Sequence, residues 1–472
     1  MDRLLSAVEA VDTRGDLSAT DITSIELDSR IVRAGALFCC VPGRRFDGHD
    51  FAADALGAGA TALLVERPLP LPAPQIVVAP GTARSAMADL SRAFYGDPAG
   101  SLVTVGVTGT NGKTTVTHLL ASILDTHGLP CAVIGTLGGA RTTPEAPALQ
   151  ALLAEARDSG RGAVAMEVSS HALSEHRVEG VHFAMAVFTN LSHEHLDYHG
   201  TMEQYFAAKA ELFTPRYSAQ GVVNADDPWG RRLVDGAALP ITPFGRDDAT
   251  DVVVSGGETM FTWRGVRVHL KLRGTYHVIN ALAAATAAAD LGVPVDVVAE
   301  GLARAEPVPG RFEVVEVPAP FTVVVDYAHT PDGLRHALAS ARALAGSARV
   351  LCVFGCGGDR DRDKRPQMGA VAEAGADVVV VTSDNPRRED PQAIINAVLA
   401  GMNDPSAERV MVEPDRRSAI AKAVDAARSG DVVVVAGKGH ERTIEVAGQF
   451  LPFEDKVEAA AAVANRTDGR RS

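Results

Sequence analysis

A glycine-rich segment between a strand pattern and a helix pattern constrains the fold of this chain most strongly. Residues 103–107 form an apolar run typical of a strand, residues 116–124 have a helical pattern, and the segment 108–115 between them reads TGTNGKTT. Glycines allow the backbone N–H groups of such a loop to face phosphate oxygens, and the N-terminus of the following helix adds positive potential. This order of strand, loop and helix predicts an α/β layer with a nucleotide triphosphate site.

Two side chains of this loop have roles that follow from their chemistry. Lys113 would reach the β- and γ-phosphates, and the Thr114 hydroxyl would hold Mg²⁺. The usual spacing of such loops places a glycine at position 107, where this chain has Val107, and Gly106 comes one residue too early. The flanking strand and helix still favour a phosphate site. The predicted ATP-binding residues of the loop are Gly109, Thr110, Asn111, Gly112, Lys113, Thr114 and Thr115.

The rest of the chain repeats the same alternation of structure. Runs of Val, Ile and Leu alternate with Ala-rich helical stretches, which predicts an α/β fold with largely parallel sheets. A chain of 472 residues is long enough for about three domains of about 150 residues each. Turn-forming segments at 95–98 and 307–310 place the predicted domains at 1–98, 99–310 and 311–472. The proline-rich stretch 68–80 is interpreted as a surface connection in the first domain.

Composition excludes several classes of protein. A net charge of −14 argues against a general nucleic-acid binder, which usually has a basic face. Apolar runs such as 432–436 are strand-sized and too short to insert into a membrane. The five cysteines include no CxxC pair, and the first residues contain no signal-peptide core. We therefore expect reduced thiols and a cytoplasmic protein.

Acidic and histidine residues follow two further strand-like runs. Glu167 closes the run at 163–165 and is placed to bind Mg²⁺, although an edge-strand salt bridge would also explain it. The segment 189–199 contains His193, His195 and His199, which allows a zinc site. With a triphosphate loop present, a single histidine assisting Mg²⁺ is the more economical interpretation. Lys209, in a helical pattern, is by itself an ordinary helix lysine.

A charged loop, 384–390, follows the apolar run 378–381. Charged loops at the carboxyl ends of strands are where open α/β sheets bind ligands. Asp384 and Arg387 are close enough in sequence to bind an amine and a carboxylate together, as an amino-acid site requires. The alternative is a solvated turn, since Asn-Pro is a common turn signal. The flanking residues 388–390 are expected to be solvated in either case.

Taken together, these segments resemble the Mur ligases. The matching segments are TGTNGKTT at 108–115, EVSSHAL at 167–173, HLDYH at 195–199, AKAELF at 208–213 and VDYAHTPDGL at 325–334. Within that family they are most similar to the MurE group, which adds the third residue of the peptidoglycan stem peptide. The resemblance covers nearly the whole chain. It implies an N-terminal UDP-binding domain, a central ATPase domain and a C-terminal Rossmann-like domain that takes the incoming amino acid.

The resemblance also implies substrates and cofactors. They are ATP, UDP-MurNAc-L-Ala-D-Glu and meso-diaminopimelate, with Mg²⁺ as the metal and CO₂ as the source of a carbamate on Lys209. The product would be the UDP-linked tripeptide, with ADP and phosphate released through an acyl-phosphate intermediate. A monomer that binds no nucleic acid is expected.

Site residues are carried over by matching positions in the motifs. The implied catalytic residues are Lys113, Glu167, His195, Lys209 and Asp326, and the implied metal ligands are Thr114, Glu167, His195 and carbamylated Lys209. Asn280 and Arg311 join the loop in binding ATP. The implied contacts of the UDP-substrate are Leu27, Ser29, Thr142, Thr143, Ser169, Glu175 and Arg177. Those of diaminopimelate are Arg360, Asp384, Asn385, Pro386, Arg387, Gly437 and Glu441.

The choice of amino acid depends on residues 384–387. In the family the sequence DNPR, present here, marks diaminopimelate, and lysine-adding enzymes differ there. Arg387 can bind the carboxylate that diaminopimelate has and lysine lacks, because a guanidinium binds carboxylates in a fork. Glu175, Glu194 and His277 depart from the usual family residues. The alternatives are a lysine-adding ligase, a non-catalytic nucleotide-binding homologue and a zinc hydrolase.

Overall fold

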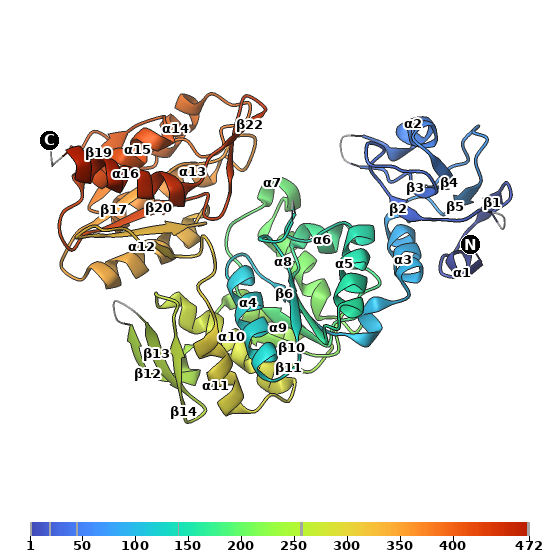
Figure 1. Ribbon diagram of the computed structural model, residues 1–472, viewed down its shortest axis with the longest axis horizontal. Coiled ribbons are helices and arrows are strands. Elements are labelled where there is room, and N and C mark those ends of the chain that lie inside the picture. The colour runs from blue at the N-terminus through green and yellow to red at the C-terminus, as the bar shows by residue number, and fades with distance from the viewer. Residues whose placement is uncertain (1, 18–19, 44–45, 140, 255–257, 470–472) are drawn as a thin grey trace.

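The computed structural model describes residues 2–17, 20–43, 46–139, 141–254 and 258–469. These residues form three α/β regions that follow one another along the chain and lie in a row, with the two chain ends in the outer regions (Figure 1). The α/β fold class predicted from the sequence is confirmed. The division at residues 98 and 310 stays a prediction, and none of the sheets in the described chain crosses either position.

The N-terminal region contains a mostly parallel sheet in the order β1-β5-β4-β3-β2, with only β1 antiparallel to its neighbour. Its strands are β1 (Asp12–Arg14), β2 (Ser24–Glu26), β3 (Ala36–Cys39), β4 (Ala60–Val65) and β5 (Gln75–Val77), and its α-helices are α1 (Asp2–Leu5), α2 (Ala52–Gly57) and α3 (Ala83–Tyr95). The interpretation of 68–80 as a surface connection was wrong in part, since β5 within it is buried. Its Gln-Ile-Val run pairs with β4, and apolar burial outweighs the neighbouring prolines.

The central region is built on a parallel sheet in the order β11-β10-β9-β6-β8-β7. Its strands are β6 (Val103–Thr108), β7 (Cys131–Ile134), β8 (Ala163–Glu167), β9 (Met185–Phe188), β10 (Gly221–Asn224) and β11 (Ile241–Phe244). Its α-helices are α4 (Lys113–Thr126), α5 (Ala146–Asp158), α6 (Ser170–Ser174), α7 (Leu196–His199), α8 (Met202–Ala210), α9 (Pro228–Gly236), α10 (Tyr276–Asp290) and α11 (Val295–Arg304). Because β6 is an inner strand with buried cores on both faces, the glycine loop leaves the sheet near its middle.

A small antiparallel sheet follows the central sheet and was not predicted from the sequence. It consists of β12 (Ala249–Val254), β13 (Thr259–Trp263) and β14 (Val266–Leu270). Phe261 and Trp263 on β13 are buried in the same core as α4, α10 and α11. This sheet therefore extends the central core rather than forming a core of its own.

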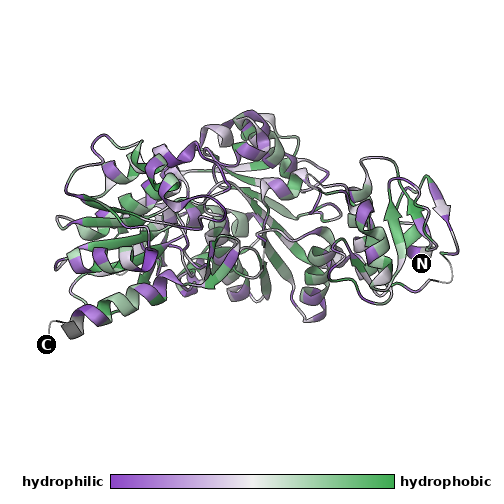
Figure 2. Ribbon diagram, turned by 90° about the horizontal axis from the view of Figure 1, so that it is seen from above, coloured by the Kyte–Doolittle hydropathy of each residue, from purple (hydrophilic) through white to green (hydrophobic). Residues whose placement is uncertain are grey.

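The C-terminal region has a sheet in the order β15-β16-β20-β17-β18-β19, parallel except for β15. Its strands are β15 (Glu313–Val315), β16 (Thr322–Asp326), β17 (Val350–Phe354), β18 (Val378–Val381), β19 (Val410–Val412) and β20 (Val432–Ala436), followed by the hairpin of β21 (Thr443–Val446) and β22 (Gln449–Pro452). Its α-helices are α12 (Pro331–Ala345), α13 (Lys364–Gly375), α14 (Pro391–Leu399), α15 (Arg416–Ala426) and α16 (Asp455–Gly469). Apolar residues gather on the sheets and on the helix faces that pack on them (Figure 2).

Within the described residues, none of the helices combines the length and the apolar character needed to cross a lipid bilayer.

A fully buried ion pair holds the C-terminal region together. Arg416 at the start of α15 donates through Nε and Nη2 to the two carboxylate oxygens of Asp455, both at 2.7 Å, and both side chains have no exposed surface. The same guanidinium donates to the carbonyl oxygens of Ser383 and Ala436 at 3.1 and 2.9 Å. Arg416 thus ties the carboxyl ends of β18 and β20 to α16.

We expect Arg416→Ala to destabilise the C-terminal region by about 3–5 kcal/mol, because it leaves a buried carboxylate without its counter-ion. Urea unfolding, monitored by far-UV circular dichroism of the backbone, measures the change in the free energy of unfolding. The matched control is Arg417→Ala. It removes an ion pair with Glu458 in which the Arg417 side chain is 67% exposed, and it should leave the urea midpoint of unfolding nearly unchanged. Equal effects of the two variants would contradict the importance of the buried pair.

Candidate active site

Two glycines of the predicted phosphate loop are required by close packing. Gly109 and Gly112 have φ of +147° and +88°, backbone angles that residues with a side chain rarely adopt. A Cβ on Gly109 would lie 1.9 Å from Thr189 Oγ1, and a Cβ on Gly112 would lie 2.5 Å from Asn280 Oδ1. The backbone N–H of Asn111 donates to Asn190 Oδ1 at 2.9 Å. The loop is therefore held in one shape by residues that follow β9 and by α10.

Two lysines converge on this loop, Lys209 fully buried and Lys113 partly buried. Lys113 Nζ donates to the carbonyl oxygens of Gly109 and Thr110, and Lys209 Nζ donates to the carbonyl of Gly109, all at 2.9 Å. Burial lowers the pKa of both lysines, and for Lys209 the nearby charge of Lys113 adds to a pKa well below its usual range. Among the described residues no carboxylate forms an ion pair with either of them. The loop thus gathers two amines whose protonated forms an anion would stabilise.

Glu167 lies at the end of β8 and faces the same cavity as Thr114. It is 1% exposed, and its two carboxylate oxygens accept from the backbone N–H and the hydroxyl of Thr136 at 2.8 and 3.1 Å. The edge-strand salt bridge that would explain Glu167 without a metal is absent from the described residues. A buried carboxylate beside a threonine hydroxyl fits Mg²⁺, which takes one or two carboxylates and completes its shell with water and phosphate oxygens.

The histidines at 193–199 do not converge. His193 faces Asp361 at 3.5 Å, His195 faces Glu194 at 3.6 Å, and His199 contacts the Ser170 hydroxyl at 2.9 Å. Burial lowers the pKa of His195 to about 4, so its ring is neutral and able to bind a metal. In the described chain, no group of three or more His, Cys, Asp or Glu side chains is arranged to hold a metal ion. The zinc hypothesis therefore has no support from the geometry.

The central and C-terminal regions meet at this loop through specific contacts. Glu194 Oε1 lies 2.8 Å from His329 Nε2, and Asn111 Nδ2 donates to Asp332 at 3.2 Å. Although burial alone would raise the pKa of Glu194, its interactions with His195, His329 and Lys364 hold it well below its usual range. Glu194 is therefore an anion at the interface of the two regions.

Arg311 makes a further connection. Its Nη2 donates to the Thr114 hydroxyl at 2.8 Å, and its guanidinium lies 4.5 Å from the centre of the Tyr327 ring. Asp326, at the end of β16, accepts from the backbone N–H groups of Phe312 and Ala328 at 2.6 and 2.8 Å. Burial raises the pKa of Asp326. Asp326 thus fixes the backbone next to Arg311.

A cavity of about 240 Å³ opens between these elements. The predicted site residues that line it are Thr110, Asn111, Gly112, Lys113, Thr114, Thr115, Thr142, Glu167, Ser169, His195, Asn280, Arg311 and Asp326. It joins residues that are widely separated in the sequence. His277, which lies near it on α10, is fully buried with neither ring nitrogen hydrogen-bonded among the described residues, and burial lowers its pKa to about 3.

The loop at 384–390 adjoins this cavity through the segment that follows β20. Gly437, at φ +119°, lies so close to Asp384 that a Cβ would be 2.9 Å from its Oδ2. Glu441 accepts from Lys438 Nζ and Asn385 Nδ2, both at 2.8 Å. The neighbouring His440 ring lies 5.1 Å from that of Tyr327, a cavity residue. Arg360 and Pro386 lie nearby, Arg360 exposed and Pro386 buried.

The prediction that residues 388–390 are solvated was wrong for Glu389. Its carboxylate accepts two hydrogen bonds from Arg365, at 2.9 and 3.1 Å, and one from the backbone N–H of Asp359 at 2.6 Å. Hydrogen bonds from Arg365 lower its pKa to about 2. Asp390 caps α14 through the N–H of Gln392. A charged turn was expected to face water, but a second loop packs over it.

Residues implied for the UDP-substrate form a cluster beside the cavity, which Thr142 and Ser169 also line. Thr143 Oγ1 donates to the carbonyl oxygen of Glu167 at 2.9 Å and accepts from the N–H of Ser169 at 3.0 Å. Arg177 pairs with Glu175 and with Glu145, the latter at 3.1 Å. Leu27 and Ser29, beside β2, have no hydrogen bond to this cluster among the described residues. The structure therefore brings Thr143, Ser169, Glu175 and Arg177 together, but not Leu27 and Ser29.

Comparison with known proteins agrees with this geometry. The Mur ligase family catalytic domain matches residues 21–95, the Mur ligase middle domain 107–288, and the Mur ligase glutamate ligase domain 310–439. UDP-N-acetylmuramoyl-L-alanyl-D-glutamate--2,6-diaminopimelate ligase of Geobacillus kaustophilus is 44% identical, with 94% of this chain and 96% of that protein covered. The chain belongs to the Mur ligase family.

Two further relatives extend the comparison. The ligase of the same name from Streptomyces avermitilis is 44% identical, with 97% of each chain covered. A solved structure with that name is 33% identical and has a TM-score of 0.65, covering 97% of this chain and 98% of its own. MurF of Thermotoga maritima in complex with ADP has a TM-score of 0.69 at 22% identity, covering 96% and 99%, and shares the fold.

Sequence reasoning missed several residues of this Mur ligase. Glu145 and Arg84 pair at 3.2 Å and extend the cluster around Arg177. Tyr327 stacks on Arg311, and Glu445 contacts Arg387. None of these residues belongs to a glycine loop or to an acid cluster at a strand end. Each joins the site through a contact between elements that are distant in the sequence.

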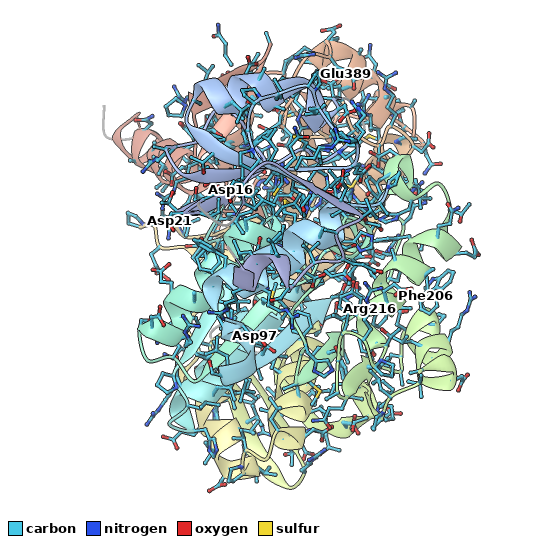
Figure 3. The ribbon with its side chains drawn as sticks, turned by 90° about the vertical axis from the view of Figure 1, so that its right-hand side faces the viewer. Asp16, Asp21, Asp97, Phe206, Arg216 and Glu389 are labelled. Atoms are coloured by element: carbon cyan, nitrogen blue, oxygen red, sulfur yellow. The ribbon has the colours of Figure 1, made fainter. Side chains whose placement is uncertain are left out.

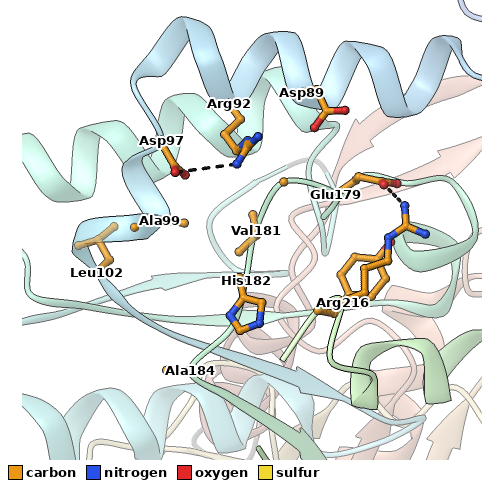
Figure 4. A pocket seen from close by; sticks show the side chains of 13 residues that line it. Asp89, Arg92, Asp97, Ala99, Leu102, Glu179, Val181, His182, Ala184 and Arg216 are labelled. Carbon is orange, nitrogen blue, oxygen red and sulfur yellow. Dashed lines mark hydrogen bonds and ion pairs between the residues drawn. The ribbon is translucent and has the colours of Figure 1, made fainter. Parts of the chain in front are cut away.

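A larger cavity of about 500 Å³ lies elsewhere, where α3 meets the central region (Figure 4). Charged side chains line it, and they include two ion pairs, Arg92 with Asp97 and Arg216 with Glu179. Figure 3 labels Asp97 and Arg216. None of the sequence-predicted site residues lines this cavity. Its volume alone does not connect it with the chemistry of this Mur ligase.

We expect Gly112→Ala to weaken ATP binding by roughly tenfold or more, because the added Cβ would collide with Asn280 and require a strained φ. Titration calorimetry with ATP and Mg²⁺ measures the effect. Gly128→Ala is the matched control, since Gly128 has φ of +83° but no atom within 4 Å of the added Cβ. Similar affinities of the two variants would show that the packing of the loop is not needed for binding.

Proposed function

We propose that the chain is an ATP-dependent ligase that joins meso-diaminopimelate to UDP-N-acetylmuramoyl-L-alanyl-D-glutamate. The observation that carries this proposal is the cavity that Lys113 and Glu167 of the central region line together with Asp326 and His329 of the C-terminal region. Lys209 does not line the cavity but donates to the carbonyl oxygen of Gly109 in the loop beside it. Such a cavity can hold a triphosphate on one side and an acceptor amine on the other. Relatives that carry this activity in their names match the chain along nearly its full length.

The first step is a phosphoryl transfer. The γ-carboxylate of the D-glutamyl residue attacks the γ-phosphorus of ATP, the bond to the bridging oxygen breaks, and ADP leaves an acyl phosphate behind. Catalysis of such a transfer consists mostly of positioning and charge neutralisation. Lys113 and the N–H groups of Gly109 to Thr115 bind the phosphates. Asn280, packed against Gly112, and Arg311, bound to Thr114, contact the nucleotide.

Metal binding supports the same step. Mg²⁺, when bound, supplies positive charge next to the phosphate oxygens, and Thr114, Glu167 and His195 would hold it. A carbamate on Lys209 would add a further anionic ligand. Carbamylation needs a neutral amine, and burial lowers the pKa of Lys209 well below its usual range.

The second step forms the amide bond. The free amine of diaminopimelate attacks the acyl carbon, and phosphate leaves from the tetrahedral intermediate. Asp326 and His329 lie at the carboxyl end of β16, where they can orient the amine. The contact of His329 Nε2 with Glu194 Oε1 holds the two regions close enough for the amine and the acyl phosphate to meet.

The remaining residues would bind the two larger substrates. Leu27, Ser29, Thr142, Thr143, Ser169, Glu175 and Arg177 bind the UDP-dipeptide. Arg360, Asp384, Asn385, Pro386, Arg387, Gly437 and Glu441 bind diaminopimelate. Arg387 receives the distal carboxylate, which L-lysine lacks. Since ATP and nucleotide-activated sugars are made in the cytoplasm, we place the enzyme there, as a monomer.

Two alternatives differ in observable ways. A ligase that adds L-lysine would not need the guanidinium of Arg387, which is held here by a hydrogen bond of 2.7 Å from its Nη1 to the carbonyl oxygen of Gly358. A non-catalytic nucleotide-binding homologue would not need Lys113, Glu167 and Lys209 packed around one loop. Both observations favour the ligase specific for diaminopimelate.

Phosphate release from ATP in the presence of the UDP-dipeptide tests the function. We expect kcat/KM for meso-diaminopimelate to exceed that for L-lysine by about 30- to 1,000-fold, since a charge-assisted fork contributes about 2–4 kcal/mol. Omitting the UDP-dipeptide is the control for uncoupled hydrolysis. Higher turnover with L-lysine, or no turnover with either amino acid, would contradict the proposal.

We also expect Lys209→Ala to be nearly inactive and to regain part of its activity with formate or acetate, which can take the place of the carbamate as a metal ligand. The same phosphate assay measures the rescue. Lys271→Ala removes an exposed lysine that pairs with Glu306 and should keep full activity without added acid. If no short carboxylic acid restores activity to Lys209→Ala, the carbamate is not supported.

A further inference from the structure

The hairpin of β21 and β22 contacts the loop that carries Arg387. The N–H of Arg387 donates to the carbonyl oxygen of Glu445 at 3.0 Å, and the N–H of Ala447 donates to the carbonyl oxygen of Arg387 at 2.6 Å. Asn385 Oδ1 accepts from the N–H of Glu445 at 2.9 Å. These bonds make a short parallel pairing between Arg387 and Val446. The hairpin is thus attached to the loop along its backbone.

This attachment holds Arg387 in an uncommon conformation. Its φ is +55°, in the left-handed region that residues other than glycine rarely adopt. Such a backbone persists only where the surroundings over-determine it. Here the hairpin supplies hydrogen bonds on both sides of the residue. The direction in which the Arg387 side chain leaves the backbone therefore depends on β21.

Two contacts then fix the guanidinium itself. Arg387 Nε lies 3.2 Å from Glu445 Oε2, and Arg387 Nη1 donates to the carbonyl oxygen of Gly358 at 2.7 Å. A Cβ on Gly357 would lie only 3.0 Å from Nη1, so the loop passes directly against the guanidinium. Among the described residues, Nη2 has no hydrogen-bond partner. The group is oriented at two points while one of its nitrogens remains available to a ligand.

Glu445 differs from Glu441, another carboxylate near this loop. Glu441 is bound by Lys438, which is fully buried, and by Asn385. Glu445 contacts Arg387 instead, and the side chains of both residues are 23% exposed. Within the described residues, Glu445 is the carboxylate that forms an ion pair with the Arg387 guanidinium.

We infer that Glu445 is a positioning residue for substrate recognition, which holds the Arg387 guanidinium in the orientation that receives the distal carboxylate of meso-diaminopimelate. This inference rests on the proposed function. An arginine oriented in advance loses less side-chain freedom when a carboxylate binds. Glu445 would therefore increase the affinity for diaminopimelate without touching the reacting atoms, and would have no effect on a substrate that lacks the distal carboxylate.

Steady-state kinetics of Glu445→Ala test this role. We expect KM for meso-diaminopimelate to rise roughly tenfold, with kcat and KM for ATP nearly unchanged, because only the orientation of Arg387 is lost. Glu445→Gln keeps an oxygen that can accept from Nε and should show a smaller rise. The slow reaction with L-lysine should keep its kcat/KM in both variants. Glu454→Ala, near the end of the same hairpin, is the control with an exposed carboxylate.

A double-mutant cycle with Arg387→Ala separates positioning from a general structural role. In the Arg387→Ala background, Glu445→Ala should not lower kcat/KM for diaminopimelate any further. Three outcomes would each overturn the inference. They are an equal loss of kcat/KM in both backgrounds, an unchanged KM for diaminopimelate in Glu445→Ala, and a decreased KM, which would mark Glu445 as a competitor for Arg387. Wild-type turnover is measured first, since its absence would refute the proposed function rather than the role of Glu445.

Discussion

The site depends on positive charge that the fold buries around one carbonyl oxygen. Lys113 and Lys209 come from different helices, and both donate to the carbonyl of Gly109. Two like charges in a low-dielectric interior repel each other and lower each other's affinity for protons. A triphosphate, a metal-bound carboxylate or a carbamate relieves this repulsion. Glu167 supplies such a negative charge near Lys113, and the proposed modification of Lys209 would supply another.

A second constraint is that the central and C-terminal regions meet beside these two lysines. Glu194 reaches across to His329, and Arg311 binds Thr114 at the start of α4. These contacts place the end of β16 opposite the phosphate loop. The C-terminal region in turn depends on the buried pair of Arg416 and Asp455, which ties the ends of β18 and β20 together next to the loop at 384–390. The stability of this region and the geometry of the loop at 384–390 are therefore linked.

Residues within one motif were predictable from the sequence, and contacts between motifs were not. The loop at 108–115 could be predicted because the strand, the glycines and the helix are local signals. Glu167 could be predicted from its place at the end of a strand. Lys209 had no local signal, since an ordinary helix lysine has the same neighbours in sequence. Glu389 was expected to be solvated, because the loop that carries Asp359 and Arg365 is distant in sequence. The burial of β5 was not predicted, because the prolines beside it in the sequence indicated a surface connection.

The amino-acid sequence by itself determined the α/β class, the phosphate loop and the identity of Arg387 as a candidate for carboxylate recognition. Local periodicity and glycine chemistry operate over a few residues, so they can be read without knowing which segments meet. Only the tertiary structure decided that Lys209 lies against Gly109, that Glu194 faces His329, and that Glu445 contacts Arg387. Each of these contacts joins elements that are far apart in the chain, and burial and charge pairing between such elements arise only once the sheets and helices are packed.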